Sequence, residues 1–393
     1  MTDTERLPKG KNIAVFSDGT GQKGGVGFNT NVYRLFSMIE DRTNDQIAFY
    51  DPGLGTAWNK LSGNILGVGI QKNILECYQF ISDHYQWKDR IFLFGFSRGA
   101  ATVRSLAGFI FRFGILPHSR PELVKTAWAI YEDRSDAREK NIDKFLSRNP
   151  TTWCNIEFIG VWDTVAALGT IPGTKHKFHD FTLSQCVQYA YHAMSIDEDR
   201  KAFLLEPFIT QANGKSLLGD VLEDPKYAWE IDQKPEDLWP RKQIVRQVWF
   251  SGVHTDVGGG YETSGLSDIP LLWMVDRATD GKVLEHPLRL AAFNSIKREQ
   301  NAHDVMHSER NTFRKRLMFR PGQRTWDPET CGKPVIHASV LARRDGNGGA
   351  RGVPYRPWIL ETFKEGEYEI EPWENEGTPR APPFPSLLAS TLA

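Results

Sequence analysis

The sequence predicts an α/β fold in which a doubly wound, mostly parallel sheet carries helices on both faces. Five short apolar runs of strand length alternate along the chain with helical patterns, and three of these runs are almost continuously hydrophobic. Parallel strands have this continuous character when helices cover both of their faces, because neither face then meets water. The alternation of strand and helix gives the doubly wound order.

The expected strands each end in a turn signal and cover residues 12–17, 46–50, 90–94, 156–162 and 244–253. Helices are expected after the second and third strands, where apolar side chains recur at three- and four-residue spacing. These two patterns span residues 70–81 and 101–110, and Gly114 and Pro117 end the second one.

The chain is expected to form one domain over residues 1–370, with insertions between the later strands. The insertion at 168–243 is too long for a simple crossover and is rich in Phe, Tyr, Trp and Pro. Such insertions commonly cover the carboxyl edge of a sheet, so we predict that this one is a lid over the site. Residues 371–393 are rich in proline and are expected to be a loosely structured tail.

Composition excludes several classes of protein. The 393 residues include 48 Lys and Arg against 49 Asp and Glu, and this balance argues against a nucleic-acid binder. We expect no transmembrane segment, no secretory signal and a cytoplasmic location, because no apolar run reaches 18 residues and the first residues are polar. The four cysteines form no C-x-x-C pair, which argues against a zinc site or a disulfide framework.

The motif GFSRG, residues 95–99, stands directly between the third apolar run and a helical pattern. A G-x-S-x-G motif in this context holds its serine on a sharp, strained turn at the carboxyl edge of the sheet. It therefore predicts Ser97 as a nucleophile, with the backbone amide of Arg98 as one donor to the oxyanion. The structural alternative is a tight turn whose serine only caps the helix.

A serine nucleophile needs a base, and His254 is the predicted one. It follows the run IVRQVWFSGV and opens HTDVGGGY, whose three glycines indicate a sharply turning backbone beside a crowded site. Asp256 is expected to support it. His192, in a helix-like pattern inside the insertion, and His337, near an expected edge strand, are the rival candidates.

Asp163 ends the run IEFIGVW and is the predicted acid. An Asp at this place could equally cap a following helix. The order along the chain favours catalysis, because Ser97, Asp163 and His254 stand in the order nucleophile, acid, base. In that role Asp163 would orient the imidazole and stabilise its charged form.

The first strand ends in a glycine-rich turn, SDGTGQKGG, at residues 17–25. Its spacing does not match a nucleotide-binding loop. We predict instead that the amide of Gly19 or Thr20 supplies the second oxyanion donor and that Asp18 braces the turn. The site is expected to work with no metal and no cofactor.

Two other functions stay open on the residues alone. Acidic and histidine side chains at strand ends could converge on a divalent cation, which would indicate a metal-dependent phosphohydrolase. Those residues are Asp18, Asp51, Asp163, His254 and Asp256. That interpretation gives Ser97 and its glycines no role. A catalytically silent module that binds a partner is the other alternative.

Several blocks in order resemble the DUF2235 family of α/β-hydrolases, which includes Tle1-type phospholipase effectors of the type VI secretion system. The blocks fall within residues 11–275 and read FSDGTGQ, YDPGLGT, GIQKNILECYQFI, GFSRGAATVRSLAGFI, GVWDTVAALG, HAMSIDEDRKAF, VWFSGVHTDVGGGY and LSDIPLLWM. The resemblance implies an α/β-hydrolase-like fold and a serine esterase or phospholipase.

Carried over by motif, the resemblance places a Ser-Asp-His triad on Ser97, Asp163 and His254. Gln22 departs from the family's first block, where an Asn is usual. The implied substrate is a lipid or a small-molecule ester, and peripheral contact with a membrane and type VI export are open. Oligomeric state is not encoded in any pattern that we recognise.

Overall fold

The computed structural model of the protein describes residues 10–19, 24–53, 63–165, 183–212, 215–218, 243–293, 299–310, 320–346 and 354–373, the side chains of 63–68 excepted. An eight-stranded sheet runs through this part of the chain, and every neighbouring pair of its strands is parallel. The strand order is β10-β9-β8-β5-β4-β3-β1-β2. The sheet is therefore α/β-hydrolase-like and doubly wound, as predicted.

The strands that form this sheet are β1 (Asn12–Ser17), β2 (Gln46–Asp51), β3 (Arg90–Phe96), β4 (Ile156–Trp162), β5 (Val187–Ser195), β8 (Ile244–Phe250), β9 (Val335–His337) and β10 (Glu369–Glu371). All five strands expected from the sequence are present. The turn of GFSRG begins at the end of β3, which runs two residues longer than expected. A separate small hairpin pairs β6 (Gln211–Ala212) with β7 (Lys215–Ser216).

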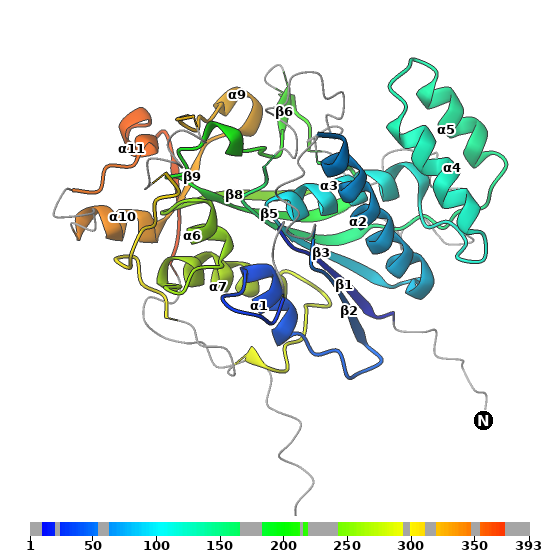
Figure 1. The fold of residues 1–393 in the computed structure, drawn as a ribbon, viewed down its shortest axis with the longest axis horizontal. Helices are drawn as coiled ribbons and strands as arrows, with labels where there is room; N and C mark the ends of the chain where they lie inside the picture. Colours follow the sequence, from blue (N-terminus) through cyan, green and yellow to red (C-terminus); the bar gives the residue numbers. More distant parts are fainter. Residues whose placement is uncertain are drawn as a thin grey trace, which may run out of the picture.

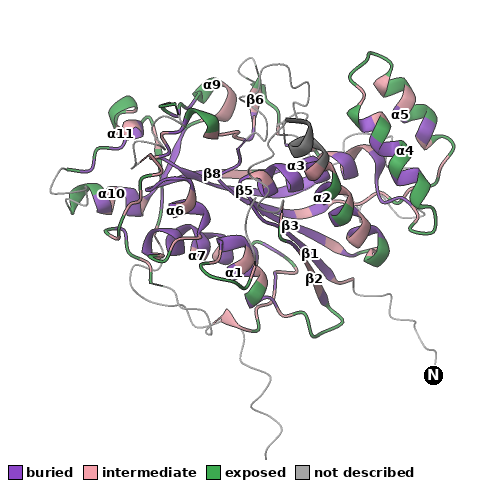
Figure 2. Ribbon diagram, in the orientation of Figure 1, coloured by how far each residue is buried: buried purple, intermediate pink, exposed green. Residues whose placement is uncertain are grey.

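Helices cover both faces of the sheet (Figure 1). One face packs against α2 (Gly63–His84) and α3 (Arg98–Phe113), through a core that includes Ile74, Tyr78 and Phe109. Outside α3 lie α4 (Pro121–Glu132) and α5 (Arg138–Leu146). The opposite face packs against α1 (Asn31–Met38) and α7 (Gly265–Thr279). The strands are buried between these layers (Figure 2), which explains their continuous hydrophobic character.

Smaller elements complete the sheet's far edge and the site. They are the 3₁₀ turn η2 (Lys201–Phe203), α6 (His254–Gly258), α9 (Pro328–Cys331), α10 (Ala338–Asp345) and α11 (Trp358–Thr362). A third apolar cluster lies at this edge, around Trp249 and Ile336. No described helix combines the length and hydropathy needed to cross a bilayer. All four cysteines are free thiols.

The expected lid at 168–243 is wrong in part, because its middle is a central strand of the sheet. All nine residues of β5 are buried, and β5 pairs with β4 on one side and β8 on the other. The helix-like interpretation around His192 is therefore wrong as well. The run VQYAYHAMS mixes polar and aromatic residues, and burial on both faces overrides its weak strand signal. Residues 166–182 and 219–242 lie outside the described residues.

The boundary of the expected tail also needs a correction. Glu371 ends strand β10 and is buried, and its carboxylate binds Arg246, Trp273 and Arg277. The folded part of the chain thus includes residues 371–373. Residues 374–393 lie outside the described residues.

Candidate active site

Ser97 stands at the turn between β3 and α3, as the sequence predicts. Its backbone has φ 59° and ψ −119°, in a region that L residues rarely adopt. Neighbouring backbone crowds this turn, because a Cβ on Gly99 would overlap the carbonyl of Ser17 and a Cβ on Gly95 would lie 2.5 Å from the carbonyl oxygen of Gly99. The two glycines of GFSRG are thus required by close approach, and the strained turn presents the Ser97 hydroxyl.

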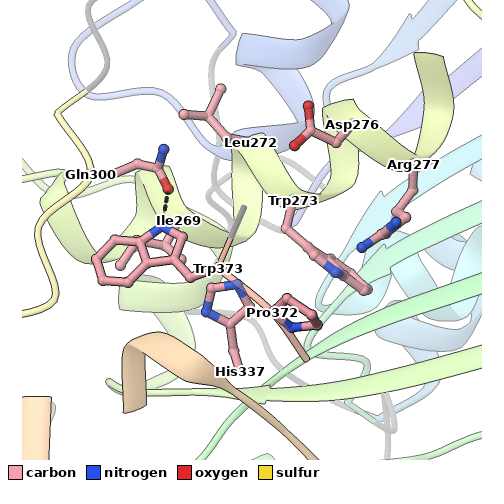
Figure 3. Close-up of a pocket in the computed structure, with 9 residues that line it drawn as sticks. All are labelled: Ile269, Leu272, Trp273, Asp276, Arg277, Gln300, His337, Pro372 and Trp373. Atoms are coloured by element: carbon pink, nitrogen blue, oxygen red, sulfur yellow. Dashed lines mark hydrogen bonds between the residues drawn. The ribbon is translucent and has the colours of Figure 1, made fainter. Parts of the chain in front are cut away.

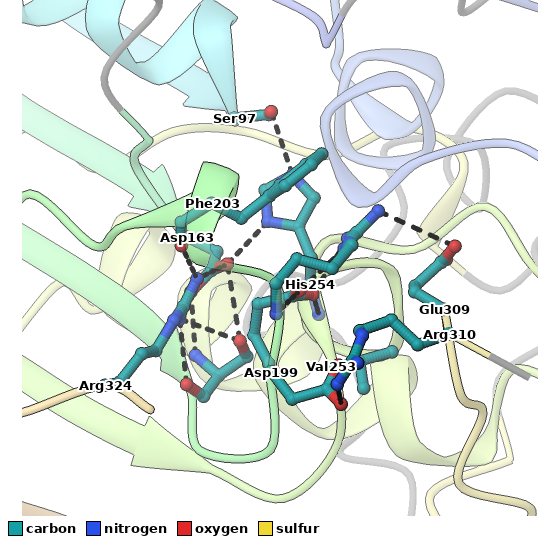
Figure 4. Close-up of polar contacts among 12 residues, drawn as sticks. Ser97, Asp163, Asp199, Phe203, Val253, His254, Glu309, Arg310 and Arg324 are labelled. Carbon is teal, nitrogen blue, oxygen red and sulfur yellow. Dashed lines mark hydrogen bonds and ion pairs between the residues drawn. The ribbon is translucent and has the colours of Figure 1, made fainter. Parts of the chain in front are cut away.

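His254 reaches Ser97 from the end of another strand. It is the first residue of α6, four residues after β8 ends, and its Nε2 lies 2.8 Å from Ser97 Oγ. Its Nδ1 lies 2.5 Å from Asp163 Oδ2 (Figure 4). All three side chains are buried. The structure therefore brings the three predicted residues into one hydrogen-bonded chain, from hydroxyl to imidazole to carboxylate.

Asp163 occupies a second strained position, with φ 43° directly after β4. Its amide donates to the carbonyl of Ala193, and its Oδ1 accepts from the amide of Ser195, both on the neighbouring β5. Burial alone would raise the pKa of this carboxyl group, but Arg324 and His254 lower the pKa below its usual range. Asp163 therefore stays ionised, and its side chain is held by the adjacent strand.

The sequence reasoning missed Arg324, which clamps the same carboxylate. Its Nη1 lies 2.5 Å from Asp163 Oδ1 and its Nη2 lies 2.8 Å from Oδ2. The side chain is almost fully buried. Arg324 stands in an irregular stretch with no motif around it, and no local signal in the sequence distinguishes it from the other arginines.

Two aromatic rings flank the imidazole of His254. The ring of Phe96 lies 4.5 Å from it, and that of Phe203, in η2, lies 5.0 Å away in an edge-on arrangement. Arg200 covers Phe203 with its guanidinium 3.5 Å from the ring centre. Glu198 binds this guanidinium and also accepts from the amide of His254 at 3.2 Å. The HAMSIDEDRKAF block thus supplies Glu198, Arg200 and Phe203 of this surrounding, and β3 supplies Phe96.

The glycine-rich turn after β1 lies beside Ser97, since a Cβ on Gly19 would come 3.5 Å from the Cβ of Ser97. Asp18 braces this turn by accepting from the Gly19 amide and from the hydroxyls of Thr30 and Tyr50. Burial raises the pKa of Asp18 to about 6, although these hydrogen bonds oppose the rise. The Gly19 amide therefore already has an acceptor in this structure. Thr20 lies outside the described residues.

Arg98 is the first residue of α3, so its amide is among those that a helix leaves without an intrahelical acceptor.

Asp256 has a structural role near the site. Its Oδ2 accepts from the amide of Val253 and caps α6, while its Oδ1 lies 2.6 Å from Nδ1 of His307. Asp256 thus supports the helix turn that carries His254, and it does so through the backbone.

The rival histidines have structural partners. His192 is fully buried in β5, where its Nε2 accepts from the amide of Thr164 at 3.1 Å, and burial lowers its pKa to about 3. His337 caps α10 by accepting from the amide of Ser339. It lines a small pocket with Trp273 and Trp373 (Figure 3). Neither contacts Ser97 in any described interaction.

The residues proposed for a cation do not form a metal cluster. Asp163 and His254 pair with each other, Asp18 binds Thr30 and Tyr50, and Asp51 accepts from the Ser17 hydroxyl. Within the described ranges, no three His, Cys, Asp or Glu side chains come together in a way that could hold a metal ion. Their carboxylates are engaged by hydrogen-bond donors of the protein.

Comparison with known proteins identifies relatives. Residues 11–277 match the family model described as the catalytic domain of Tle1-like phospholipase effectors of the type VI secretion system. A protein of Saccharomyces cerevisiae, YEL023C, is 27% identical over 279 residues, which are 63% of this chain and 40% of the yeast protein.

Two solved structures are also similar. One is an uncharacterized protein from Pseudomonas aeruginosa, with 19% identity, a TM-score of 0.37, and coverage of 68% of this chain and 45% of that chain. The other is a Tle1 effector bound to the VgrG spike of a type VI secretion system, with 17% identity, a TM-score of 0.32, and coverage of 65% and 52%. The chain matches less than half the length of both the yeast protein and the Pseudomonas protein.

Proposed function

Because this chain belongs to the family of Tle1-like phospholipase catalytic domains, a family of hydrolases, we propose that it is a serine hydrolase that cleaves the carboxylic ester of a lipid. The observation that carries the proposal is the hydrogen-bonded chain of Ser97, His254 and Asp163, with distances of 2.8 and 2.5 Å. A strained turn that presents the hydroxyl, an imidazole and a buried carboxylate are the parts of an acyl-transfer site.

In the proposed reaction, Nε2 of His254 takes the proton of Ser97 Oγ while that oxygen attacks the ester carbonyl. The carbonyl oxygen becomes an oxyanion, and the amide of Arg98 is the proposed donor to it. The tetrahedral intermediate collapses, His254 protonates the leaving alcohol, and an acyl group remains on Ser97. A water molecule, deprotonated by His254, then releases the acid and restores the hydroxyl.

Asp163 has the role of orienting the imidazole and balancing its charge. Its low pKa keeps it ionised throughout the cycle, so it accepts a hydrogen bond from the Nδ1–H of His254 without taking that proton. The hydrogen bond to Nδ1 leaves Nε2 as the nitrogen that can accept a proton from Ser97.

Apolar groups near the imidazole support an acyl ester as the substrate. The ring of Phe203 lies against His254 and is partly exposed, and Leu204, which follows it, is 48% exposed. An acyl chain gains free energy by burying its methylene groups against such a surface. The family description adds phospholipid as the proposed substrate class.

The test compares hydrolysis of phosphatidylcholine vesicles and of a soluble p-nitrophenyl ester by the wild-type protein, S97A and S105A. Ser105 is a buried serine of α3, so S105A is a matched control for the same chemical change. We expect S97A to lose on the order of 10³-fold or more in kcat and S105A to keep it. Activity that survives in S97A, or that EDTA abolishes, would overturn the proposal. The ratio of vesicle to soluble-ester turnover tests the lipid class.

A further inference from the structure

Arg324 links two parts of the site that come from distant stretches of the chain. Besides its two bonds to Asp163, its Nη1 lies 2.8 Å from both the carbonyl oxygen and the hydroxyl of Ser195. Its Nη2 lies 3.1 Å from the carbonyl oxygen of Phe203 (Figure 4). The residue lies beyond the 11–277 region that matches the family model.

We propose that Arg324 is a positioning residue: it fixes the Asp163 carboxylate toward His254 and ties the turn carrying Phe203 to that carboxylate. This inference rests on the proposed serine hydrolase function.

The two hydrogen bonds from Arg324 to Asp163 support the claim that Arg324 fixes the carboxylate toward His254. A guanidinium that binds both oxygens of a carboxylate fixes the plane of that group, which a single donor cannot do. Asp163 also has a left-handed φ, and a strained residue keeps its conformation only where its surroundings hold it firmly. With Ser195 donating from one strand and Arg324 from an irregular segment, the carboxylate has one orientation, and Oδ2 faces the imidazole.

The contacts of Phe203 support the claim that Arg324 ties the turn carrying Phe203 to the Asp163 carboxylate. The Phe203 carbonyl is held by Arg324 and its ring is covered by Arg200, and that ring lies against His254. Loss of the Arg324 guanidinium would leave the carboxylate with only its bonds to Ser195 and His254, and would also remove the bond to the Phe203 carbonyl. Both losses act on the imidazole from different sides, so a small displacement there is expected to cost about 10²-fold in kcat.

The pH dependence of kcat/KM distinguishes this role from a purely structural one, because it responds to the charge of Arg324. Among the residues that the structure describes, the charged groups in the polar network around His254 are Asp163 after β4, Glu198 with its partner Arg200, Asp256 of α6 with its partner His307, and Arg324. Removing the Arg324 cation leaves the negative charge of Asp163 without its closest counter-ion. The protonated imidazole is then favoured, and the base loses activity at a higher pH than in the wild-type protein.

The experiment measures kcat and KM against pH, with the soluble p-nitrophenyl ester, for the wild-type protein, R324Q, R324K and R343Q. Arg343 is a matched control, because it is also buried and donates to two backbone carbonyls, those of Ala302 and Asp304. R324Q should lose about 10²-fold in kcat, and the acidic limb of its kcat/KM profile should move up by about one pH unit. R324K should return the limb toward its wild-type position and recover only part of kcat.

R343Q should keep the wild-type limb. R324K serves as the second variant if R324Q does not fold, which its circular dichroism and thermal unfolding would show. The inference would be overturned if R324Q kept the wild-type kcat and its acidic limb did not move. If R324Q does not fold and R324K does, the same result in R324K would overturn it. An equal change in R343Q would do the same. S97A is measured in the same series, so an active S97A identifies failure of the proposed function, while an inactive S97A with unaffected Arg324 variants identifies failure of this inference alone.

Discussion

The ring of Phe96 packs 4.5 Å from the imidazole of His254, with 33° between the two planes. Phe96 belongs to the turn that carries Ser97, and His254 follows a strand three positions away in the sheet. Gly258, at the end of α6, makes this contact feasible, because a Cβ at this position would overlap the Phe96 ring. The contact sets the distance between the hydroxyl turn and the helix that carries the imidazole.

We therefore predict that G258A lowers kcat by moving Phe96 against His254. F96L removes the far end of the ring and should relieve the overlap, so the double variant G258A/F96L should be more active than G258A alone. A double-variant cycle on kcat and on the free energy of unfolding measures the coupling. Additive effects of the two changes on kcat would show that overlap between residue 258 and the Phe96 ring does not cause the loss of activity in G258A.

The histidines give a second prediction. H254A should fold and lose on the order of 10³-fold in kcat, since it removes the proposed base. H337A should keep the wild-type kcat and lose about 1 kcal/mol or more in free energy of unfolding, because His337 caps α10 and stacks on Phe250. Steady-state kinetics and denaturant unfolding of both variants decide the assignment. A larger loss of kcat in H337A than in H254A would reverse it.

A third prediction concerns stability and pH. Burial raises the pKa of Asp197 to about 6, despite hydrogen bonds from the Gly252 amide and the Tyr355 hydroxyl to its Oδ2. An unfolded Asp titrates near 3.9, so between about pH 4 and 6 the folded chain keeps a proton that the unfolded chain has lost. The free energy of unfolding should therefore fall as pH rises through this window and level off above it.

D197N removes this titration and keeps an oxygen that can accept both hydrogen bonds. Its free energy of unfolding relative to the wild-type protein should increase from pH 4 to pH 7, by on the order of 1 to 3 kcal/mol. Urea unfolding at both pH values checks this. A difference that is constant with pH, or that shrinks at pH 7, would contradict the prediction.

Residues with local signals could be predicted from the sequence. Ser97 stands between two glycines at a strand-to-helix turn, and Asp163 and His254 follow apolar runs, so each could be placed at the same edge of a parallel sheet. The backbone of Ser17 crowds position 99, and the backbone of Gly99 crowds position 95, so only glycine fits at either position. This requirement explains why the motif can be recognised in the sequence.

Other features depended on contacts that no local pattern encodes. Strand β5 was missed because its polar His192 and Ser195 find partners only once neighbouring segments pack against them. Arg324 was missed for the same reason, since its carboxylate partner lies 161 positions earlier. Both belong to the interior polar network, whose pairing depends on tertiary structure.

Covalent labelling by a fluorophosphonate probe, with the modified residue located by peptide mass spectrometry, tests directly whether Ser97 is the nucleophile. We predict one adduct, on the peptide that contains Ser97, and loss of ester turnover in proportion to labelling. Turnover that continues in fully labelled protein, or inactivation with the adduct on another residue, would contradict it.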